Sequence, residues 1–370
     1  MRLAFVLFKY FPYGGLQRDC MKIAVECRER GHAISLYCLE WSGSKPEGMD
    51  VHVVPVRSWR NYHRYDQFVS RVHQAVQQQG YDGVIGFNRM PGLDVYFGAD
   101  PCFAVKCQQR SSWYRFLPRS RSFLKAEQAV YGKESSTHIL LLSDLEIDAI
   151  QHLYGTPDAR FHLLPPGVAR DRLASADYQQ RRQEFRQQLG LKDGEKLLLM
   201  VGSGFRVKGA DRALEALKQL PDALRNKTQL MILGRDNQAP FERMARQLGL
   251  EDRVHFMGGR DDAPSFLFAA DLLIHPAYRE SAGMVLLEAV AARLPVLVTD
   301  TCGYSFHIQR SGAGIVHESP FDLQRFTREL VQMLSGDPRP WQQAAEKYVA
   351  QTDIFGLAET AADVIEEVVA

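Results

Sequence analysis

The sequence predicts an α/β protein with two doubly wound domains, each built on a parallel sheet. The chain has 370 residues, more than the roughly 250–300 residues that one hydrophobic core usually supports. Short, nearly continuous apolar runs alternate with helical stretches along its whole length, which is typical of buried parallel strands. The stiff turn Leu164-Pro-Pro-Gly-Val168 separates two such alternating halves.

The first half contains short apolar runs bounded by glycine, proline or charge, and these are the expected strands: residues 3–8, 34–39, 51–56, 83–87 and 138–142. Helices are expected at residues 17–30 and 66–79. The first run also resembles the apolar part of a signal peptide, but Lys9 ends it after six residues. We therefore expect a first strand rather than a cleaved leader.

The second half repeats the rhythm, with strands expected at residues 197–201, 230–233, 254–256, 272–275 and 296–299. The expected helices cover residues 178–188, 211–219, 241–248, 263–269, 285–292 and 321–334. We predict an N-terminal domain of residues 1–164 and a C-terminal domain of residues 165–352. A terminal helix within 353–370 is expected to pack back on the first domain.

Composition limits the function classes. The net charge of +1 excludes a chain built throughout for nucleic-acid binding. Six cysteines are scattered without a C-x-x-C or a metal-finger spacing, which favours buried thiols in a reducing compartment. No run approaches the roughly 18 apolar residues of a membrane span. We expect a cytoplasmic protein.

The most informative segment is Glu280-Ser-Ala-Gly-Met-Val-Leu-Leu-Glu288, which follows an expected strand. Small residues before a helix start allow a ligand to approach the backbone, and the first helical turn presents N–H groups to an anion. Glu280 and Glu288 could then reach groups on either side of a phosphate, as a nucleotide-sugar requires. The alternative is an amphipathic helix in which Glu288 is an ordinary polar residue.

Two glycine-containing loops follow expected strands. Gly14-Gly15 lies after the first strand, where open α/β sheets bind ligands, although it is not a G-x-G-x-x-G. Arg206 and Lys208-Gly209 follow the first strand of the second domain but do not form a P-loop. A solvated loop is the alternative for these cations.

No D-x-D motif offers metal ligands. Asp144, Glu146 and Asp148 resemble a metal cluster, but Ser143-x-x-Glu146 favours a helix capping box. We therefore expect no metal and no cofactor, with cations and a helix N-terminus meeting the charge of a leaving pyrophosphate.

These motifs together resemble the retaining glycosyltransferases of the glycogen-synthase-like superfamily. The segments 87–97, 271–278 and Cys302-Gly-Tyr304 are similar to the lipopolysaccharide core glucosyltransferase I family of Gram-negative bacteria. This resemblance covers nearly the full chain. It implies two Rossmann-like domains facing across a cleft, the GT-B architecture. It also implies transfer of a hexose from a uridine diphosphate (UDP) sugar to an inner-core heptose of lipopolysaccharide.

The resemblance assigns roles to individual residues. Glu288 would bind the ribose, Arg206 and Lys208 the diphosphate, and Arg260 would lie near the uracil. Gly14 and Gly15 would lie against the phosphates. Glu280, Ala282, Gly283 and Met284 would surround the sugar and phosphate, and Asp19 and Asp100 would face the acceptor. Family members often have the basic pair adjacent, whereas Val207 separates it here, so Lys208 is the safer phosphate ligand.

The sequence leaves the mechanism and some functional alternatives open. Retention could proceed through a covalent intermediate or through same-face displacement, in which Glu280 positions the sugar and Asp100 or Asp19 orients the acceptor. A nucleotide-sugar epimerase, a glycan phosphorylase and a non-catalytic membrane scaffold are alternatives on the same architecture. The transferred hexose could be glucose, galactose or an N-acetylated hexosamine.

Residues 101–125 combine cations with aromatic side chains and contain no acidic residue. This composition favours an anionic headgroup layer, so we expect peripheral binding to the cytoplasmic face of the inner membrane. A solvated loop or a nucleic-acid site is the alternative. The expected membrane patch consists of Lys106, Arg110, Trp113, Arg115, Phe116, Arg119, Arg121 and Lys125.

Overall fold

The computed structural model describes residues 1–370 except 13, 59, 60, 109 and 176. The chain forms two compact units. Unit 1 comprises Met1–Gly167 with Gly356–Ala370, and unit 2 comprises Val168–Phe355. The chain passes from unit 1 to unit 2 within the Leu164–Val168 turn and returns beside Phe355.

Unit 1 is built on a seven-stranded parallel sheet of order β5-β3-β1-β6-β7-β8-β9. Its strands are β1 (Arg2–Val6), β3 (Ala33–Cys38), β5 (Asp50–Val53), β6 (Gly83–Gly86), β7 (Val95–Gly98), β8 (His138–Leu141) and β9 (Phe161–Leu163). A separate pair joins β2 (Lys9–Tyr10) to β4 (Glu40–Trp41). The strand order reverses between β1 and β6, which is the doubly wound arrangement expected from the sequence.

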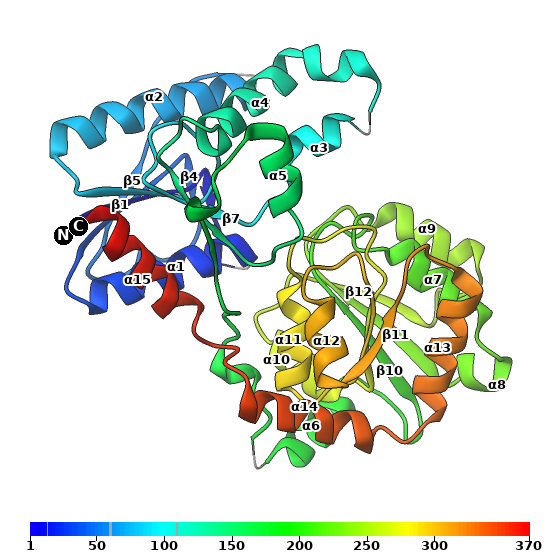
Figure 1. Ribbon diagram of the computed structural model, residues 1–370. Helices are drawn as coiled ribbons and strands as arrows, with labels where there is room; N and C mark the ends of the chain where they lie inside the picture. The colour runs from blue at the N-terminus through cyan, green and yellow to red at the C-terminus, as the bar shows by residue number, and fades with distance from the viewer. Residues whose placement is uncertain (13, 59–60, 109, 176) are drawn as a thin grey trace. The chain divides into compact units, whose positions relative to one another are not determined.

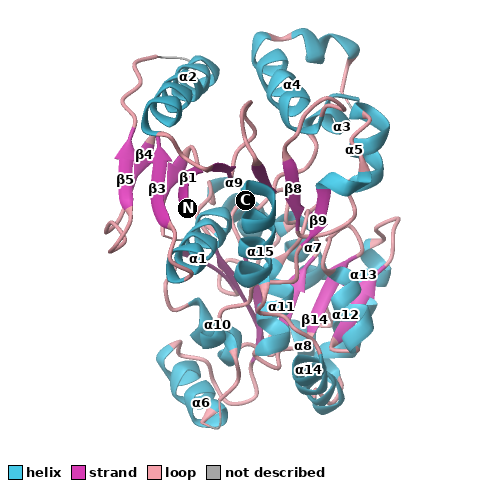
Figure 2. Cartoon of the chain, turned by 60° about the vertical axis from the view of Figure 1, so that its left-hand side comes forward, coloured by secondary structure: helices cyan, strands magenta, loops and turns pink. Residues whose placement is uncertain are grey.

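Helices cover both faces of this sheet (Figures 1 and 2). They are α1 (Gly15–Glu29), α2 (Asn61–Gln79), α3 (Phe103–Gln108), α4 (Pro118–Tyr131), α5 (Ile147–Tyr154) and α15 (Leu357–Val369). α1 and α15 lie side by side on one face, and α2 and α4 lie on the other. The C-terminal helix is held there by Arg30, whose guanidinium lies 2.6 Å from Asp363 and 3.0 Å from Glu366.

Unit 2 has a six-stranded parallel sheet of order β12-β11-β10-β13-β14-β15. Its strands are β10 (Lys196–Val201), β11 (Thr228–Leu233), β12 (Val254–Gly258), β13 (Leu272–His275), β14 (Val296–Thr299) and β15 (Gly314–His317). Its helices are α6 (Tyr178–Gln188), α7 (Ala210–Gln219), α8 (Asp222–Arg225), α9 (Ala239–Gln247), α10 (Ala263–Ala269), α11 (Met284–Ala291), α12 (Ser305–Ser311), α13 (Leu323–Ser335) and α14 (Arg339–Gln351).

The core of unit 2 explains why the sequences of these strands are almost continuously apolar. Alternate residues of one strand, such as Leu198 and Met200, pack under α7 and α13. The intervening Leu197 and Leu199 are equally buried on the other face of the sheet. Because both faces are covered, most positions of the central strands are apolar, and the polar exceptions such as His275 lie at strand ends.

Some elements differ from the sequence-based expectation. β7 and β15 were not predicted, because each has four residues and includes a glycine, which weakens the strand signal. α4 and α14 were also missed, although a proline in the first turn of each is a recognised start signal.

The expected capping box is wrong. α5 begins at Ile147 with Glu146 at its N-cap, and no side-chain hydrogen bond caps that end. Glu146 Oε2 instead accepts a hydrogen bond from the backbone N–H of Cys102, at 3.1 Å. Among the described residues, no helix is long and apolar enough to cross a membrane.

Candidate active site

The candidate site of unit 2 lies where the strand order reverses, between β10 and β13. Loops that follow neighbouring parallel strands meet at this point, so residues far apart in the sequence come together. Gly209 allows the close approach, because its φ is 77° and a Cβ there would lie 2.0 Å from the carbonyl oxygen of Pro276. The Tyr278 N–H donates to the Val207 carbonyl at 2.8 Å and ties the two loops together.

Glu280 is held at both carboxylate oxygens. Lys208 Nζ donates to Oε1, and the ring Nε2 of His275 hydrogen-bonds Oε2. The Lys208 and Glu280 side chains are 16% and 19% exposed, whereas the His275 side chain is fully buried. The three groups therefore form one charged cluster that remains partly open to a ligand.

The charge state of Glu280 follows from these contacts. Burial alone would raise the pKa of its carboxyl, but His275 and Lys208 outweigh burial and lower this pKa to about 2. Glu280 is consequently ionised at neutral pH and only accepts hydrogen bonds. His275 must then carry a proton on Nε2, and its buried Nδ1 has no hydrogen-bond partner among the described residues.

Gly283 starts the helix that follows Glu280. It is the N-cap of α11 with a φ of 90°, and a Cβ there would lie 2.3 Å from Cys302 Sγ. The Cys302 thiol donates to the Ala282 carbonyl at 3.1 Å, and burial raises its pKa. Ligand atoms of His275, Glu280 and Cys302 lie within 4.8 Å of one another. Since all three already make hydrogen bonds, a metal there would have to displace existing contacts.

Glu288 lies on α11, where the residue is only 6% exposed. Arg172 Nε approaches Glu288 Oε1 at 3.9 Å. Arg172 comes from a short 3-10 helix, Arg170–Arg172, which lies before the first strand of the unit in sequence. The two acidic residues of the motif thus have different surroundings, since Glu280 meets Lys208 and His275 whereas Glu288 meets Arg172.

The other predicted donor-binding residues of unit 2 occupy loop ends and a helix start. Arg206 is exposed, and Arg260 forms a two-point contact with Asp262 at 2.6 and 2.7 Å. Ala282 is buried, and Met284 is the first residue of α11. Arg206 is therefore not part of the Glu280 cluster, whereas Lys208 is.

In unit 1, the predicted residues lie at the carboxyl ends of strands or on the helix that follows. Gly14 is the N-cap of α1 and Gly15 its first residue. A Cβ on Gly15 would meet nothing within 4 Å, so open space lies beside it. Asp19 lies on α1, and Asp100 is exposed after β7. Their roles toward a substrate remain predictions.

The predicted membrane patch forms a surface of exposed cations and rings. Trp113 and Phe116 are 62% and 63% exposed, and Arg115 lies over the Phe116 ring at 4.8 Å. The remaining cations of the patch are also exposed: Lys106, Arg110, Arg119, Arg121 and Lys125.

A buried carboxylate, Glu127, anchors the start of this segment. It accepts hydrogen bonds from the Phe103 and Ala104 N–H groups at 2.5 and 2.9 Å. Arg89 pairs with it at 2.8 Å. The start of the segment is therefore tied to α4, the helix that carries Arg119, Arg121 and Lys125.

Sequence reasoning missed several of these residues. His275 was read only as the end of a strand, and Arg172 and Glu127 were not singled out. His275 could have been found from its position at the carboxyl end of β13, where functional residues of α/β sheets concentrate. Arg172 and Glu127 carry no comparable local signal, since their partners lie elsewhere in the sequence.

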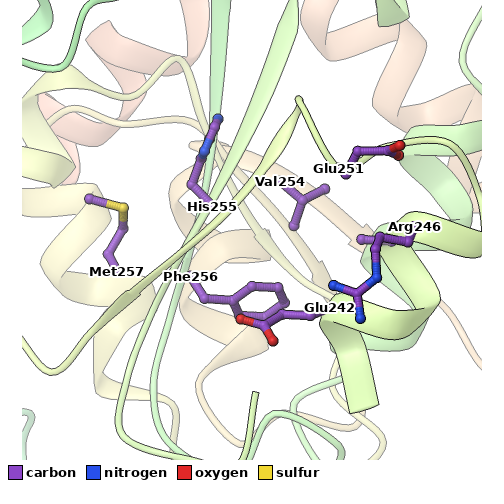
Figure 3. Close-up of a pocket in the computed structure, with 8 residues that line it drawn as sticks. Glu242, Arg246, Glu251, Val254, His255, Phe256 and Met257 are labelled. Carbon is purple, nitrogen blue, oxygen red and sulfur yellow. The ribbon is translucent and has the colours of Figure 1, made fainter. Parts of the chain in front are cut away.

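A separate pocket of about 420 Å³ lies between α9 and the edge strand β12 of unit 2. Figure 3 shows Glu242 and Arg246 of α9 on one side and His255, Phe256 and Met257 of β12 on the other. None of the Glu280 cluster lines this pocket. It is therefore distinct from the candidate active site.

Comparison with known proteins places this arrangement in a family. Residues 181–351 match the family described as Glycosyl transferases group 1, and residues 13–172 match Glycosyltransferase Family 4. The chain is 42% identical to the lipopolysaccharide glucosyltransferase WaaG of Escherichia coli K12 over 99% of this chain and 98% of that protein. It is 30% identical to an alpha-D-kanosaminyltransferase of Streptomyces kanamyceticus, over 56% of this chain and 53% of that one.

Solved structures support the same family. The crystal structure of WaaG superposes with a TM-score of 0.95 at 42% identity, covering 98% of this chain and 99% of that one. The crystal structure of Anabaena Alr3699/HepE in complex with UDP-glucose superposes with a TM-score of 0.77 at 18% identity, covering 99% of this chain and 98% of that one. The latter likeness concerns the fold alone. The chain is thus a GT-B glycosyltransferase and belongs to the lipopolysaccharide glucosyltransferase family represented by WaaG.

Proposed function

We propose that this protein transfers a hexose from a UDP-sugar to an inner-core heptose of lipopolysaccharide, with retention of the anomeric configuration and without a metal. The observation that carries the proposal is the Lys208–Glu280–His275 cluster at the strand-order reversal of unit 2. Its support is the full-length similarity to a lipopolysaccharide glucosyltransferase.

The charges of the cluster suit a nucleotide-sugar donor. A leaving diphosphate needs positive groups, and Lys208 together with the N-terminus of α11 supplies them. Lys208 balances the charge of Glu280 in the absence of a ligand. When a diphosphate binds, Lys208 can contact both anions, because its side chain is partly exposed. Arg206, exposed on the same loop, can approach the phosphates from the solvent side.

The ionised state of Glu280 favours a positioning role. A carboxyl with a pKa of about 2 is a poor proton acceptor for a neutral hydroxyl and cannot donate a proton at neutral pH. It can accept hydrogen bonds from sugar hydroxyls and stabilise positive charge at the anomeric carbon. This supports same-face displacement, in which the departing phosphate oxygen takes the acceptor proton and Asp100 or Asp19 orients the acceptor hydroxyl.

The membrane patch suits a lipid-linked acceptor. Exposed Trp113 and Phe116 can enter the interfacial layer, while the surrounding cations meet anionic headgroups. We propose that the protein works as a peripheral enzyme on the cytoplasmic face of the inner membrane.

Release of UDP, measured with and without a heptosylated lipid acceptor, tests the function. We expect release that depends on the acceptor, that survives chelation of divalent metals, and whose product keeps the donor's anomeric configuration by NMR. UDP-glucose, UDP-galactose and UDP-N-acetylglucosamine, compared in parallel, identify the donor. Conversion of the donor into another UDP-sugar without an acceptor would indicate an epimerase, and no turnover with any donor would indicate a scaffold.

Co-sedimentation with vesicles tests the membrane proposal. Vesicles containing phosphatidylglycerol should bind the wild type, more weakly as salt rises. Replacing Arg115, Arg119 and Arg121 with glutamate should remove most of this binding. Equal sedimentation of wild type and triple variant would refute the assigned surface.

A further inference from the structure

Unit 1 contains a pocket of about 760 Å³ between α2 and α4 that no role assigned so far explains. We call it the α2–α4 pocket. Its volume lies within the range of about 300–1,000 Å³ that is usual for ligand sites. Its lining contains one acidic residue, Asp66, together with cations and aromatic rings that include Phe8, Tyr62, Tyr65, Phe123, Arg121 and Lys125.

The pocket lies at the strand-order reversal of its own sheet. Phe8 follows β1, and Arg89, Met90 and Pro91 follow β6, the strand beside β1 on the other side of the reversal. This is the position where open α/β sheets bind ligands. The reversal of unit 2 holds the Lys208–Glu280–His275 cluster, so each unit has one candidate site at the corresponding place in its sheet.

The walls of the pocket are held in place by contacts that do not fill it. The Phe8 and Tyr65 rings stack with centroids 4.2 Å apart. His73 Nε2 hydrogen-bonds the Pro91 carbonyl at 2.7 Å, and Ser122 Oγ of α4 donates to Asp66 of α2 at 3.2 Å. A pocket with ordered walls can bind a ligand without first paying for its own ordering.

The lining chemistry selects the class of ligand. Flat rings such as Tyr62, Tyr65 and Phe123 offer apolar faces with polar edges, which suit the C–H faces and hydroxyls of a sugar. Arg121 and Lys125 are exposed at the pocket and outnumber Asp66, so the lining favours an anionic ligand. Together these groups favour a saccharide that carries phosphate or carboxylate groups.

The pocket is continuous with the membrane patch, because Arg121 and Lys125 belong to both. We infer that the α2–α4 pocket binds the anionic oligosaccharide of the lipid-linked acceptor, while the exposed rings of the patch contact the membrane around it. This inference rests on the proposed function, since it assigns a location to the acceptor of that reaction.

Isothermal titration of the full-length protein with deacylated, heptosylated core oligosaccharide tests the inference without requiring turnover. Two variants perturb the pocket by different means. R121E/K125E reverses two lining charges, and A126W fills the space from α4, where Ala126 lines the pocket and is partly exposed. K45E/K133E makes the same charge change at exposed sites outside both pocket and patch.

We expect both pocket variants to weaken oligosaccharide binding about tenfold or more. R121E/K125E loses charge-assisted contacts, and A126W removes the space that the ligand would occupy. The control variant should bind like the wild type, and all variants should bind UDP equally and melt normally. Tight oligosaccharide binding by both pocket variants, or no binding by the wild type, would overturn the inference. If K45E/K133E weakened oligosaccharide binding as much as the pocket variants do, the inference would also be overturned, because the attraction would then be a general charge effect.

Glycerol 3-phosphate separates the saccharide from a bare phosphate group. It should bind the wild type far more weakly than the oligosaccharide does, and equal affinity would overturn the assignment to a saccharide. UDP release with the lipid acceptor is measured separately. Absence of that release with intact oligosaccharide binding would contradict the proposed function while leaving the pocket supported.

Discussion

His275 provides the sharpest test of the Glu280 cluster, because two substitutions distinguish its two ring nitrogens. Nε2 contacts Glu280 Oε2, whereas Nδ1 has no hydrogen-bond partner among the described residues. The amide nitrogen of glutamine can occupy the place of Nε2, while that of asparagine lies near the place of Nδ1. H275Q therefore keeps a donor for Glu280, and H275N removes it.

The expected magnitude follows from the contacts of the carboxylate. A hydrogen bond to a charged group contributes about 1.5–3 kcal/mol. Lys208 still holds Oε1 in the variant, so the carboxylate is not left unpaired and a value near 2 kcal/mol is appropriate. This corresponds to roughly a 30-fold loss of kcat. Loss of the His275 contact raises the pKa of Glu280 from about 2, while Lys208 still opposes the effect of burial.

The assay is UDP release at saturating donor and acceptor, together with UDP binding by calorimetry and a thermal melt. We expect H275N to lose roughly 30-fold in kcat with unchanged UDP affinity, and H275Q to stay within about threefold of wild type. Equal kcat in the two variants, or wild-type turnover by an H275N variant that melts normally, would refute this role of His275.

Three further predictions concern other charged or buried groups. K208A should lower turnover by about 100-fold or more with the fold intact, because the diphosphate loses a preorganised cation, and wild-type turnover would exclude Lys208 from the site. E288A should weaken UDP binding through loss of the ribose contact, whereas E280A should reduce kcat more than UDP affinity. Equal losses of UDP affinity would contradict the assigned order of groups. Burial, and to a smaller extent Arg310, lowers the pKa of His307 in the folded protein from 6.5 to about 4. As the pH falls, His307 therefore binds a proton in the unfolded chain before it does so in the folded protein. The stability that neutral His307 maintains is therefore lost between about pH 6.5 and 4, and H307Q should remove about 3 kcal/mol of that pH dependence in urea unfolding.

The sequence by itself determined the doubly wound architecture and several elements to the residue. The apolar pattern and the residues that interrupt it predicted the exact ends of four elements: β13, β14, α6 and α10. Buried parallel strands must be apolar on both faces, and helices between them must be amphipathic, so this information is local. The position of Lys208 after β10 and the small residues before α11 are local signals of the same kind.

Tertiary structure alone decided which groups meet. β10 and β13 are neighbours although four helices and two strands separate them in sequence, so the Lys208–Glu280 pair depends on the strand order. His275 differs because it is only five residues from Glu280, yet its contact depends on the direction that a side chain takes at the end of a buried strand. Arg172 likewise approaches Glu288, and Phe8 and Lys125 line the same α2–α4 pocket, although long stretches of chain separate the members of each pair. Local sequence preferences do not determine such contacts. The contacts arise when helices and strands pack together, and any one helix or strand could pack against many others.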